Sequence, residues 1–117
     1  ETALNTAEQL GVLPIIYTGL SSGLRQCELI TLSWADFHVR YKYILRGQRL
    51  LILNDKTVLL LEQIPETASP YVFLNPKTEA PYKLYEFYYL HKKILRRARL
   101  PWVAFRDLQR QFMEVGI

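Results

Sequence analysis

The sequence predicts an α+β domain that is mostly helical, with a small antiparallel β-hairpin or sheet at one edge. Apolar residues recur at spacings of three and four through most of the chain, which is the period of helices that bury one face. Residues 41–53 instead form two β-rich arms joined across a glycine. The chain has 117 residues, 50% of them hydrophobic, and no repeat or low-complexity linker divides it. Residues 1–117 are therefore expected to form a single domain around one core.

Three short helices are expected in the first third of the chain. Gly11 suits the end of the first helix because glycine readily adopts positive φ, and Pro14 suits the start of the second. Gly23 can then turn the chain into the third helix. The expected bounds are about 2–11, 14–20 and 26–32, followed by an extended segment over 34–39.

The middle of the chain is expected to contain the hairpin and a fourth helix. Gly47 is the natural residue for the hairpin tip. Either Asn54 or Asp55 can cap the helix that follows, which is expected to run to about Gln63. Turn-forming residues then predict a loop over 65–81, interrupted by a short apolar strand over 71–74.

A long helix over 81–99 and a last helix over 103–115 are expected at the end of the chain. In the long helix the apolar residues fall on one stripe, so one face packs while the other is strongly positive. His91 lies on the apolar stripe and is expected to be a packed core residue rather than a ligand or base. The cations that lie mostly outside the stripe are Lys92, Lys93, Arg96, Arg97 and Arg99.

The net charge of +4 is concentrated at one end of the chain. Residues 82–117 contain eight Lys or Arg against three acids, whereas residues 1–81 contain seven against eight. This asymmetry favours a polyanion such as a nucleic acid as partner. A solubilising surface that binds nothing remains the alternative explanation of the same residues.

Cysteine and histidine usage argues against a disulfide-stabilised protein and against a metalloprotein. The single cysteine, Cys27, cannot form an internal disulfide, which favours a cytoplasmic location, and its place in a helix predicts a buried, small apolar residue. The two histidines, His38 and His91, lie far apart, so we expect neither a metal site nor a cofactor. The sequence contains no signal peptide and no apolar run long enough to span a membrane.

Residues 22–36 carry the most specific pattern, Ser-Gly-Leu-Arg-Gln-Cys-Glu-Leu-Ile-Thr-Leu-Ser-Trp-Ala-Asp. It resembles the first signature of the tyrosine recombinase (phage integrase) family, T-G-L-R-x-x-E-L-x-x-L-x-W-x-D, and departs from it only at the first position. The resemblance implies that Arg25 grips the scissile phosphate of DNA and that Glu28 supports the site from behind. A planar guanidinium can hold two phosphate oxygens at once. On these two residues alone, a structural Arg25–Glu28 pair on an ordinary helix explains the pattern equally well.

Three weaker matches follow in the same order as in the family. They are the end of the hairpin at residues 51–55, the stretch Ser-Pro-Tyr-Val-Phe-Leu-Asn-Pro-Lys-Thr at 69–78, and Arg-Ala-Arg-Leu-Pro at 97–101. Their shared order extends the resemblance over essentially the whole chain. It implies a recombinase catalytic domain, from its first signature nearly through its second, and a bacterial or phage-type source.

The hairpin tip departs from the family pattern. In the family this turn carries a lysine that acts as general acid toward the leaving 5′-oxygen of DNA, and Gln48 occupies its place here. A glutamine side chain can donate a hydrogen bond but cannot hand over a proton. The neighbouring Arg49 stays protonated under all ordinary conditions and is a poor proton donor.

The second signature, normally H-x-L-R-H-T-F, is also altered. Arg106 stands at the histidine position, and Gln109 stands where the family has a second phosphate-binding arginine. Arg110 lies one residue further along, about 100° around a helix, so its guanidinium must bend back to reach the same phosphate. The third block, which contains the nucleophilic tyrosine, would follow Ile117, so the resemblance assigns no nucleophile within this sequence.

Three hypotheses follow. The leading one is a recombinase-like domain that binds the backbone of double-stranded DNA, with self-association on the DNA, and does not cleave it. Its DNA-facing residues are Arg25, Arg49, Lys92, Lys93, Arg96, Arg97, Arg106 and Arg110. The second is a degenerate remnant that serves as a protein-interaction or structural module. The third, an active integrase completed by residues outside this sequence, is disfavoured by Gln48 and Gln109.

Overall fold

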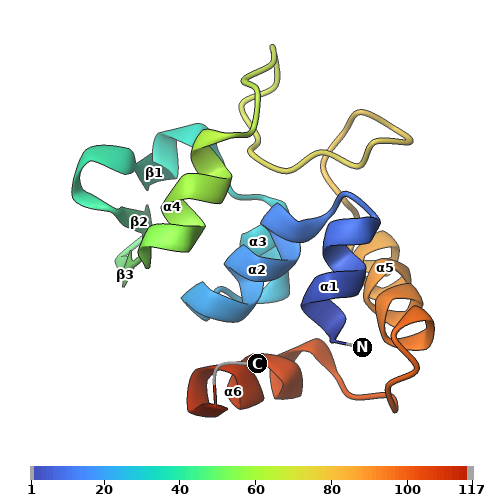
Figure 1. The fold of residues 1–117 in the computed structure, drawn as a ribbon. Coiled ribbons are helices and arrows are strands. Elements are labelled where there is room, and N and C mark those ends of the chain that lie inside the picture. The colour runs from blue at the N-terminus through green and yellow to red at the C-terminus, as the bar shows by residue number, and fades with distance from the viewer. Residues whose placement is uncertain (1, 116–117) are drawn as a thin grey trace.

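The computed structural model of the protein describes residues 2–115, arranged as six α-helices and three short strands (Figure 1). Four helices precede or follow the sheet in the first half of the chain, and two longer helices form the second half. In chain order the elements are α1 (Ala3–Gln9), α2 (Leu13–Ser22), α3 (Gln26–Ile30), η1 (Trp34–Asp36), β1 (Phe37–His38), η2 (Val39–Tyr41), β2 (Tyr43–Arg46), β3 (Arg49–Ile52), α4 (Asp55–Glu62), α5 (Leu84–Arg97) and α6 (Phe105–Val115).

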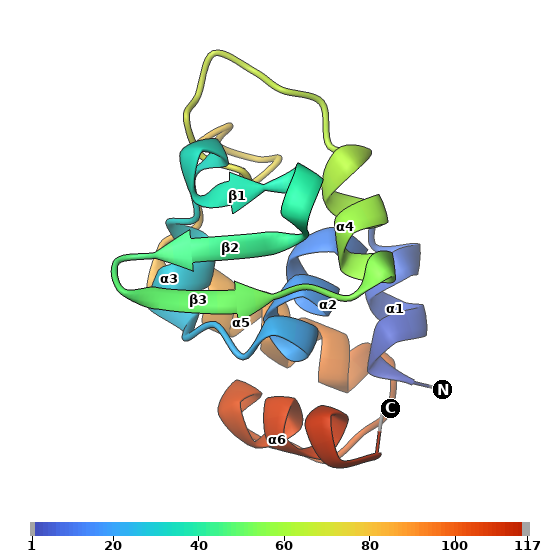
Figure 2. The same ribbon diagram turned by 90° about the vertical axis from the view of Figure 1, so that its left-hand side faces the viewer.

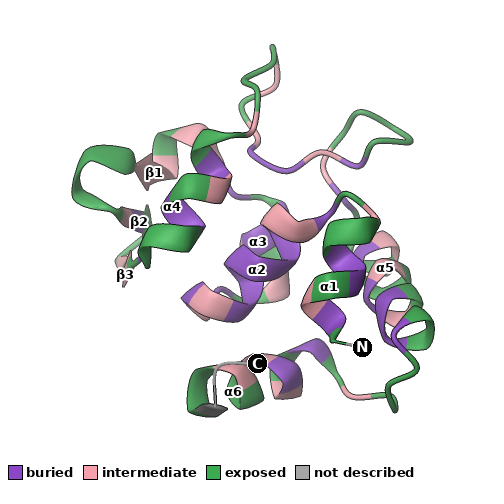
Figure 3. Cartoon of the chain, in the orientation of Figure 1, coloured by how far each residue is buried: buried purple, intermediate pink, exposed green. Residues whose placement is uncertain are grey.

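Helix α2 is the centre of the fold. It packs against α1, α3, α4 and α6, and most of its residues are buried (Figure 3). A helix that is apolar nearly all round is stable only when other elements surround it. Gly19 allows the closest of these approaches, because a Cβ there would lie 2.7 Å from both the Leu29 and Phe105 side chains.

The three strands form an antiparallel sheet in the order β1-β2-β3, at the edge of the molecule (Figure 2). Strands β2 and β3 pair in register from Tyr43↔Ile52 to Arg46↔Arg49, and residues 47–48 form a two-residue loop. Gly47 has a φ of +60°, the conformation that such a tight turn requires at its first loop position. Ile44 faces the core and is fully buried.

Helices α5 and α6 cover the remaining sides of the core. The inner face of α5 packs on α1 and α3, and the inner face of α6 packs on α2. Phe87 of α5 and Phe105 of α6 are both buried, and their rings meet nearly at right angles with centroids 5.0 Å apart. His91 is also buried, as the sequence predicted. Among residues 2–115, no helix has both the length and the apolarity needed to cross a bilayer.

The predicted fold class and the order of the helices are confirmed, and so is the hairpin turn at Gly47. Asn54 rather than Asp55 caps α4, because its side-chain oxygen accepts a 2.8 Å hydrogen bond from the Thr57 N–H. The predicted long helix is shorter at both ends than 81–99.

One predicted extended segment is wrong, and the other is confirmed only at β1 (Phe37–His38). Residues 71–74 form no strand: Tyr71 makes only an isolated bridge to Ser33, and the Val72 N–H donates to the Leu32 carbonyl. The side chains of Val72 and Phe73 are buried, which explains the apolar run without a ladder. In the segment 34–39, η1 replaces extended backbone at its start because the Asp36 carboxylate accepts from the Ser33 N–H and closes a turn.

Candidate functional site

Arg25 lies in the short connection between α2 and α3. Gly23 ends α2 in the left-handed conformation, with a φ of +77°, which only glycine adopts without strain. The next residue, Leu24, is fully buried and anchors the connection in the core. Arg25 has extended backbone dihedrals, and its side chain is exposed to solvent. The sequence Gly-Leu-Arg thus turns the chain, anchors it, and directs a cation outward.

The carboxylate of Glu28 holds this connection to the hairpin. It accepts a 2.9 Å hydrogen bond from the Arg25 backbone N–H and forms an ion pair with the Arg49 guanidinium. Burial raises the pKa of Glu28, but these hydrogen bonds and the positive charges of Arg49 and Arg25 lower it by more. The pKa therefore lies below its usual range, and Glu28 is ionised at neutral pH. The alternative of a structural side-chain pair between Arg25 and Glu28 is not observed among the described residues, since Arg25 contributes its backbone N–H and Arg49 contributes the side chain.

Two arginines of the hairpin dock it on α3. Arg49 approaches the Gly23 carbonyl at 3.5 Å in addition to Glu28. Arg46, its partner across the β2–β3 ladder, donates to the Glu28 carbonyl at 2.9 Å and to the Thr31 hydroxyl at 2.7 Å. The inward side of the hairpin thus combines the buried Ile44 with two arginines that hold the hairpin to α3.

Gln109 performs the corresponding task from α6. Its side-chain amide nitrogen donates to the carbonyls of Gly19 and Leu24, both at 2.7 Å. Since both partners are carbonyls, which only accept, the amide orientation is fixed by chemistry. Gln109 stands at the position of the family's second phosphate-binding arginine. Both of its donors are bonded to the backbone, one to α2 and one to the connection that carries Arg25.

Two exposed arginines flank Gln109 on α6. Arg106 is exposed, and Arg110 makes only a distant ion pair of 3.9 Å with Asp107. They lie three residues before and one residue after Gln109, so both project from the side of α6 next to it. Gln48 is exposed at the tip of the hairpin, beside Arg49.

The structure therefore gathers one group of the predicted residues around a single connection. The backbone at 23–25 lies between the hairpin and α6, as the hydrogen bonds of Arg49 and Gln109 require (Figure 2). Hydrogen bonds join Glu28, Arg49 and Gln109 to the connection that carries Arg25, and Gln48, Arg106 and Arg110 are their neighbours along the hairpin and α6. We call the exposed surface of these residues the Arg25 face.

The four predicted cations of α5 lie elsewhere. Helix α5 is on the side of the molecule opposite the hairpin, and it turns its buried residues toward α1 and α3 (Figures 1 and 2). The other face carries the exposed side chains of Lys93, Arg96 and Arg97, and the half-buried Lys92. The structure does not bring these residues to Arg25.

The Arg25 face can bind an anion, but it offers no proton-transfer group. Glu28 is held ionised, and the side-chain amides of Gln48 and Gln109 carry no acid or base. His38 stacks on Tyr43 with ring centroids 4.5 Å apart, and His91 is buried on the inner face of α5. Among residues 2–115, no group of three or more His, Cys, Asp or Glu could hold a metal ion.

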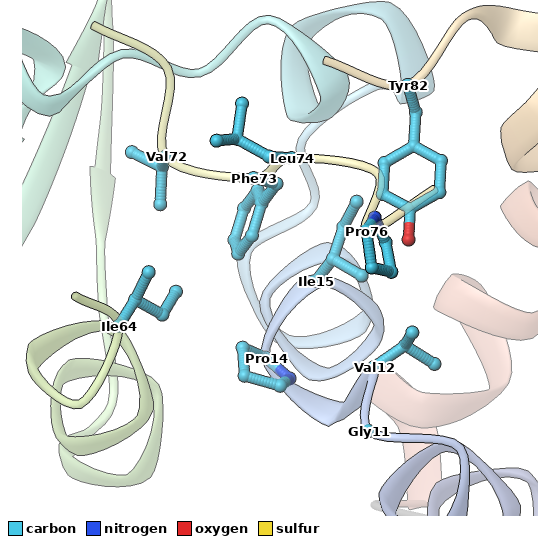
Figure 4. Close-up of a pocket in the computed structure, with 10 residues that line it drawn as sticks. All are labelled: Gly11, Val12, Pro14, Ile15, Ile64, Val72, Phe73, Leu74, Pro76 and Tyr82. Atoms are coloured by element: carbon cyan, nitrogen blue, oxygen red, sulfur yellow. The ribbon is translucent and has the colours of Figure 1, made fainter. Parts of the chain in front are cut away.

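An apolar hollow of about 220 Å³ lies away from the Arg25 face, between the turn that joins α1 to α2, the end of α4 and the segment 72–76 (Figure 4). Tyr82 is its one titratable lining residue. Burial, followed by the negative charge of Glu86, raises the pKa of Tyr82, so the phenol stays protonated at neutral pH. The hollow therefore provides packing surface and no acid or base.

The sequence interpretation missed two features of the site. Arg46 was not singled out, although its place across the turn from Arg49 in a two-residue hairpin predicts that both side chains point to the same face. Cys27 was expected to be buried and is exposed, because α3 is a single short helix whose apolar side is formed by Leu29 and Ile30.

No protein-family model matches the chain, and no curated protein matches it in sequence. Among solved structures, the crystal structure of XerA recombinase is similar to it, with a TM-score of 0.80 at 17% sequence identity. The match covers 94% of this chain and 44% of the recombinase chain, so this chain spans less than half the length of that protein. The predicted resemblance to a tyrosine recombinase is confirmed at the level of the fold.

Proposed function

We propose that this chain, which has the fold of part of a recombinase, binds the phosphate backbone of double-stranded DNA through the Arg25 face and does not cut it. Arg25 binds a backbone phosphate, and Arg106 and Arg110 bind neighbouring phosphates from α6. Such contacts carry little base information, so the affinity is weakly sequence-specific and strongly salt-dependent.

The single observation that carries the proposal is the setting of Arg25. Its side chain is exposed, whereas its own backbone N–H is held by Glu28 and the neighbouring Leu24 carbonyl is held by Gln109. A guanidinium on a fixed backbone loses less freedom on binding than one on a mobile loop, and its planar fork matches two phosphate oxygens.

Loss of strand cleavage is supported by the groups at the positions of the expected proton donor and second arginine. A 5′-oxygen leaves DNA readily only when a general acid protonates it, and Gln48 has no proton of suitable acidity. Gln109 is neutral and is already bonded to two carbonyls. The developing charge on a pentavalent phosphate would therefore meet fewer cations than in the family pattern.

A salt titration tests the proposal. We expect labelled duplex DNA to bind the chain at low salt, and Arg25→Ala to weaken this binding about tenfold, because one charge-assisted contact to phosphate is lost. The magnitude of the slope of log affinity against log salt should fall by about one, which corresponds to the loss of one phosphate contact. Fluorescence anisotropy measures both quantities, and circular dichroism checks that the variant is folded.

The matched control is Arg97→Ala, which removes an exposed arginine from α5, on the other side of the molecule. It should leave duplex affinity within about twofold, apart from a small change from net charge. Equal losses in both variants would point to diffuse attraction without a defined site. Nicking of supercoiled plasmid by this chain would overturn the absence of cleavage.

The alternative, a module that associates with a second copy of itself, is favoured by the outer face of the sheet. Leu50 and Ile52 of the edge strand β3 are 55% and 69% exposed, and an unpaired strand edge accompanies them. Sedimentation velocity tests this function: a dimer that forms without DNA and dissociates in Leu50→Lys would support it. A monomer at high protein concentration would exclude it.

A further inference from the structure

The face of α5 that points away from the core combines aromatic rings with positive charge. Five residues at positions i, i+3, i+4, i+7 and i+11 form one line along the helix, which we call the outward stripe. It consists of Tyr85, Tyr88, Tyr89, Lys92 and Arg96. The line extends over about 16 Å at the helical rise. The only acid of α5, Glu86, is engaged at the helix start, where it accepts from the Lys83 N–H.

Trp102, in the loop that follows α5, lies beside the outward stripe and forms one side of a groove. Trp102 is 51% exposed, and its ring lies 5.4 Å from that of Tyr88 at an angle of 58°. The two rings, with Lys92, Leu95, Arg96 and Leu100, line an open groove of about 380 Å³. This volume is sufficient for a nucleotide-sized ligand.

Trp102 is held in place by His91, on the core side of α5. His91 lies 5.4 Å from Trp102, ring to ring, and its Nε2 lies 2.8 Å from the Val103 carbonyl, which makes Nε2 the protonated nitrogen. The contact fixes the backbone next to Trp102 against α5. The aromatic wall is therefore formed before any ligand arrives, and little ordering is needed on binding.

We propose that this groove binds single-stranded nucleic acid, with a base stacked on Trp102 or Tyr88 and phosphates bound by Lys92 and Arg96. Rings that expose a face, next to cations that follow one line, are the two elements of a sequence-tolerant single-strand site. A duplex hides the faces of its bases, so it cannot use the rings in this way. The site is separate from the Arg25 face and does not depend on the duplex binding proposed above.

The chemistry distinguishes this ligand from an acidic protein segment. Both would satisfy Lys92 and Arg96, but only a ligand with flat, unstacked rings gains from a tilted pair of aromatic walls. The decisive probes are therefore an oligothymidine and an oligonucleotide of equal length that lacks its bases, since the two differ only in the stacking groups.

We expect the chain to bind labelled oligothymidine, and Trp102→Ala to weaken this binding about tenfold, as for the loss of one stacked base. Trp102→Phe should retain most of the affinity because it keeps a ring. The abasic oligonucleotide should bind the wild-type chain about tenfold more weakly than oligothymidine and should be insensitive to Trp102→Ala.

The matched control is Tyr41→Ala, which removes an exposed ring that also lies beside an arginine, Arg40, but in η2, between β1 and β2. It should leave oligothymidine affinity unchanged. Duplex affinity should be the same in Trp102→Ala as in the wild type, which separates this site from the Arg25 face. Equal binding of abasic and thymidine oligonucleotides, or equal competition by polyglutamate, would overturn the proposal and leave only a cationic surface.

Discussion

The Arg25 face and the outward stripe of α5 both present positive charge, but the fold uses their cations differently. Around Arg25, the guanidiniums of Arg46 and Arg49 are bonded to α3 and to the connection that precedes it. On α5, Arg96 has no ion-pair partner among residues 2–115 and lies next to exposed rings. At the Arg25 face, Arg46 and Arg49 hold the hairpin to the rest of the fold. On the outward stripe, Arg96 is available to a ligand.

This difference shows why counting charges does not locate a binding site. The C-terminal third of the chain is much the more basic part, yet the side chain that it contributes to the connection carrying Arg25, in the part of the chain that the structure describes, is the neutral Gln109. A single guanidinium on a clamped backbone defines where a phosphate can sit. A row of free cations by itself raises the local concentration of polyanions without fixing their position, so on α5 the aromatic rings beside the cations must fix it.

Gln109→Ala should show the largest effect on the clamped region. The variant removes two hydrogen bonds and leaves the Gly19 and Leu24 carbonyls without these donors, so we expect a loss of about 2 kcal/mol in the free energy of unfolding. Urea denaturation measures this loss. Gln111→Ala, on the exposed side of the same helix, should be nearly neutral. Equal stability of the two variants would contradict the role of Gln109 as a clamp.

Glu28→Ala should have the next largest effect, about 1 kcal/mol, because it releases the Arg25 N–H and the Arg49 guanidinium together. The pKa of Glu28 is lowered in the folded state, so its contribution is complete above the ordinary value of 4.5. It is lost as the pH falls through the lowered pKa. Denaturation at pH 7 and pH 3 checks this, with Glu62→Ala, at an exposed position of α4, as control.

A stability difference between Glu28→Ala and the wild type that persists unchanged at pH 3 would contradict this account of the ion pair. If Glu28→Ala also weakens duplex binding while Glu62→Ala does not, clamping of the backbone contributes to phosphate binding. That result would sharpen the contrast with α5, where no such clamp holds the cations.

The smallest of these effects is a pH dependence of the folding stability that arises from His91 of α5. Burial lowers the pKa of His91, and the hydrogen bond to Val103 raises it by less, so the folded pKa lies below 6.5. The unfolded chain then binds the proton more readily, and stability falls as the pH drops from above 6.5 through the lowered pKa. Thermal unfolding should show this decline in the wild type and a smaller decline in His91→Gln, which keeps a donor for Val103. Identical pH profiles of the wild type and His91→Gln would contradict a role of His91 in this decline.

Local signals in the sequence were sufficient for much of the fold. Gly47 predicted the hairpin turn, and the apolar stripe of α5 predicted Phe87, His91 and Ile94 on its inner face, because both depend on neighbouring residues. The same stripe wrongly included Leu84 and Tyr88, which are exposed. The stretch 71–74 shows the limit, since its buried apolar residues pack without strand partners and single-sequence patterns do not distinguish the two cases.

The sequence names the candidate residues of the site but not their connections. The pattern at residues 22–36 identified Arg25 and Glu28, and the family order pointed to Gln109. The partners of these residues are set by tertiary approach: Gln109 reaches carbonyls 85 and 90 residues earlier in the chain, and Glu28 pairs with an arginine 21 residues later. No local spacing encodes such contacts.

The most direct test is to map the duplex on the protein by nuclear magnetic resonance, which a chain of 13.8 kDa allows. On addition of a short duplex at low salt, the backbone amide signals of residues 23–25, 47–49 and 106–110 should shift together, and those of residues 92–97 should not. Shifts confined to α5, with residues 23–25 unchanged, would contradict the claim that the clamped Arg25 is the site of duplex binding.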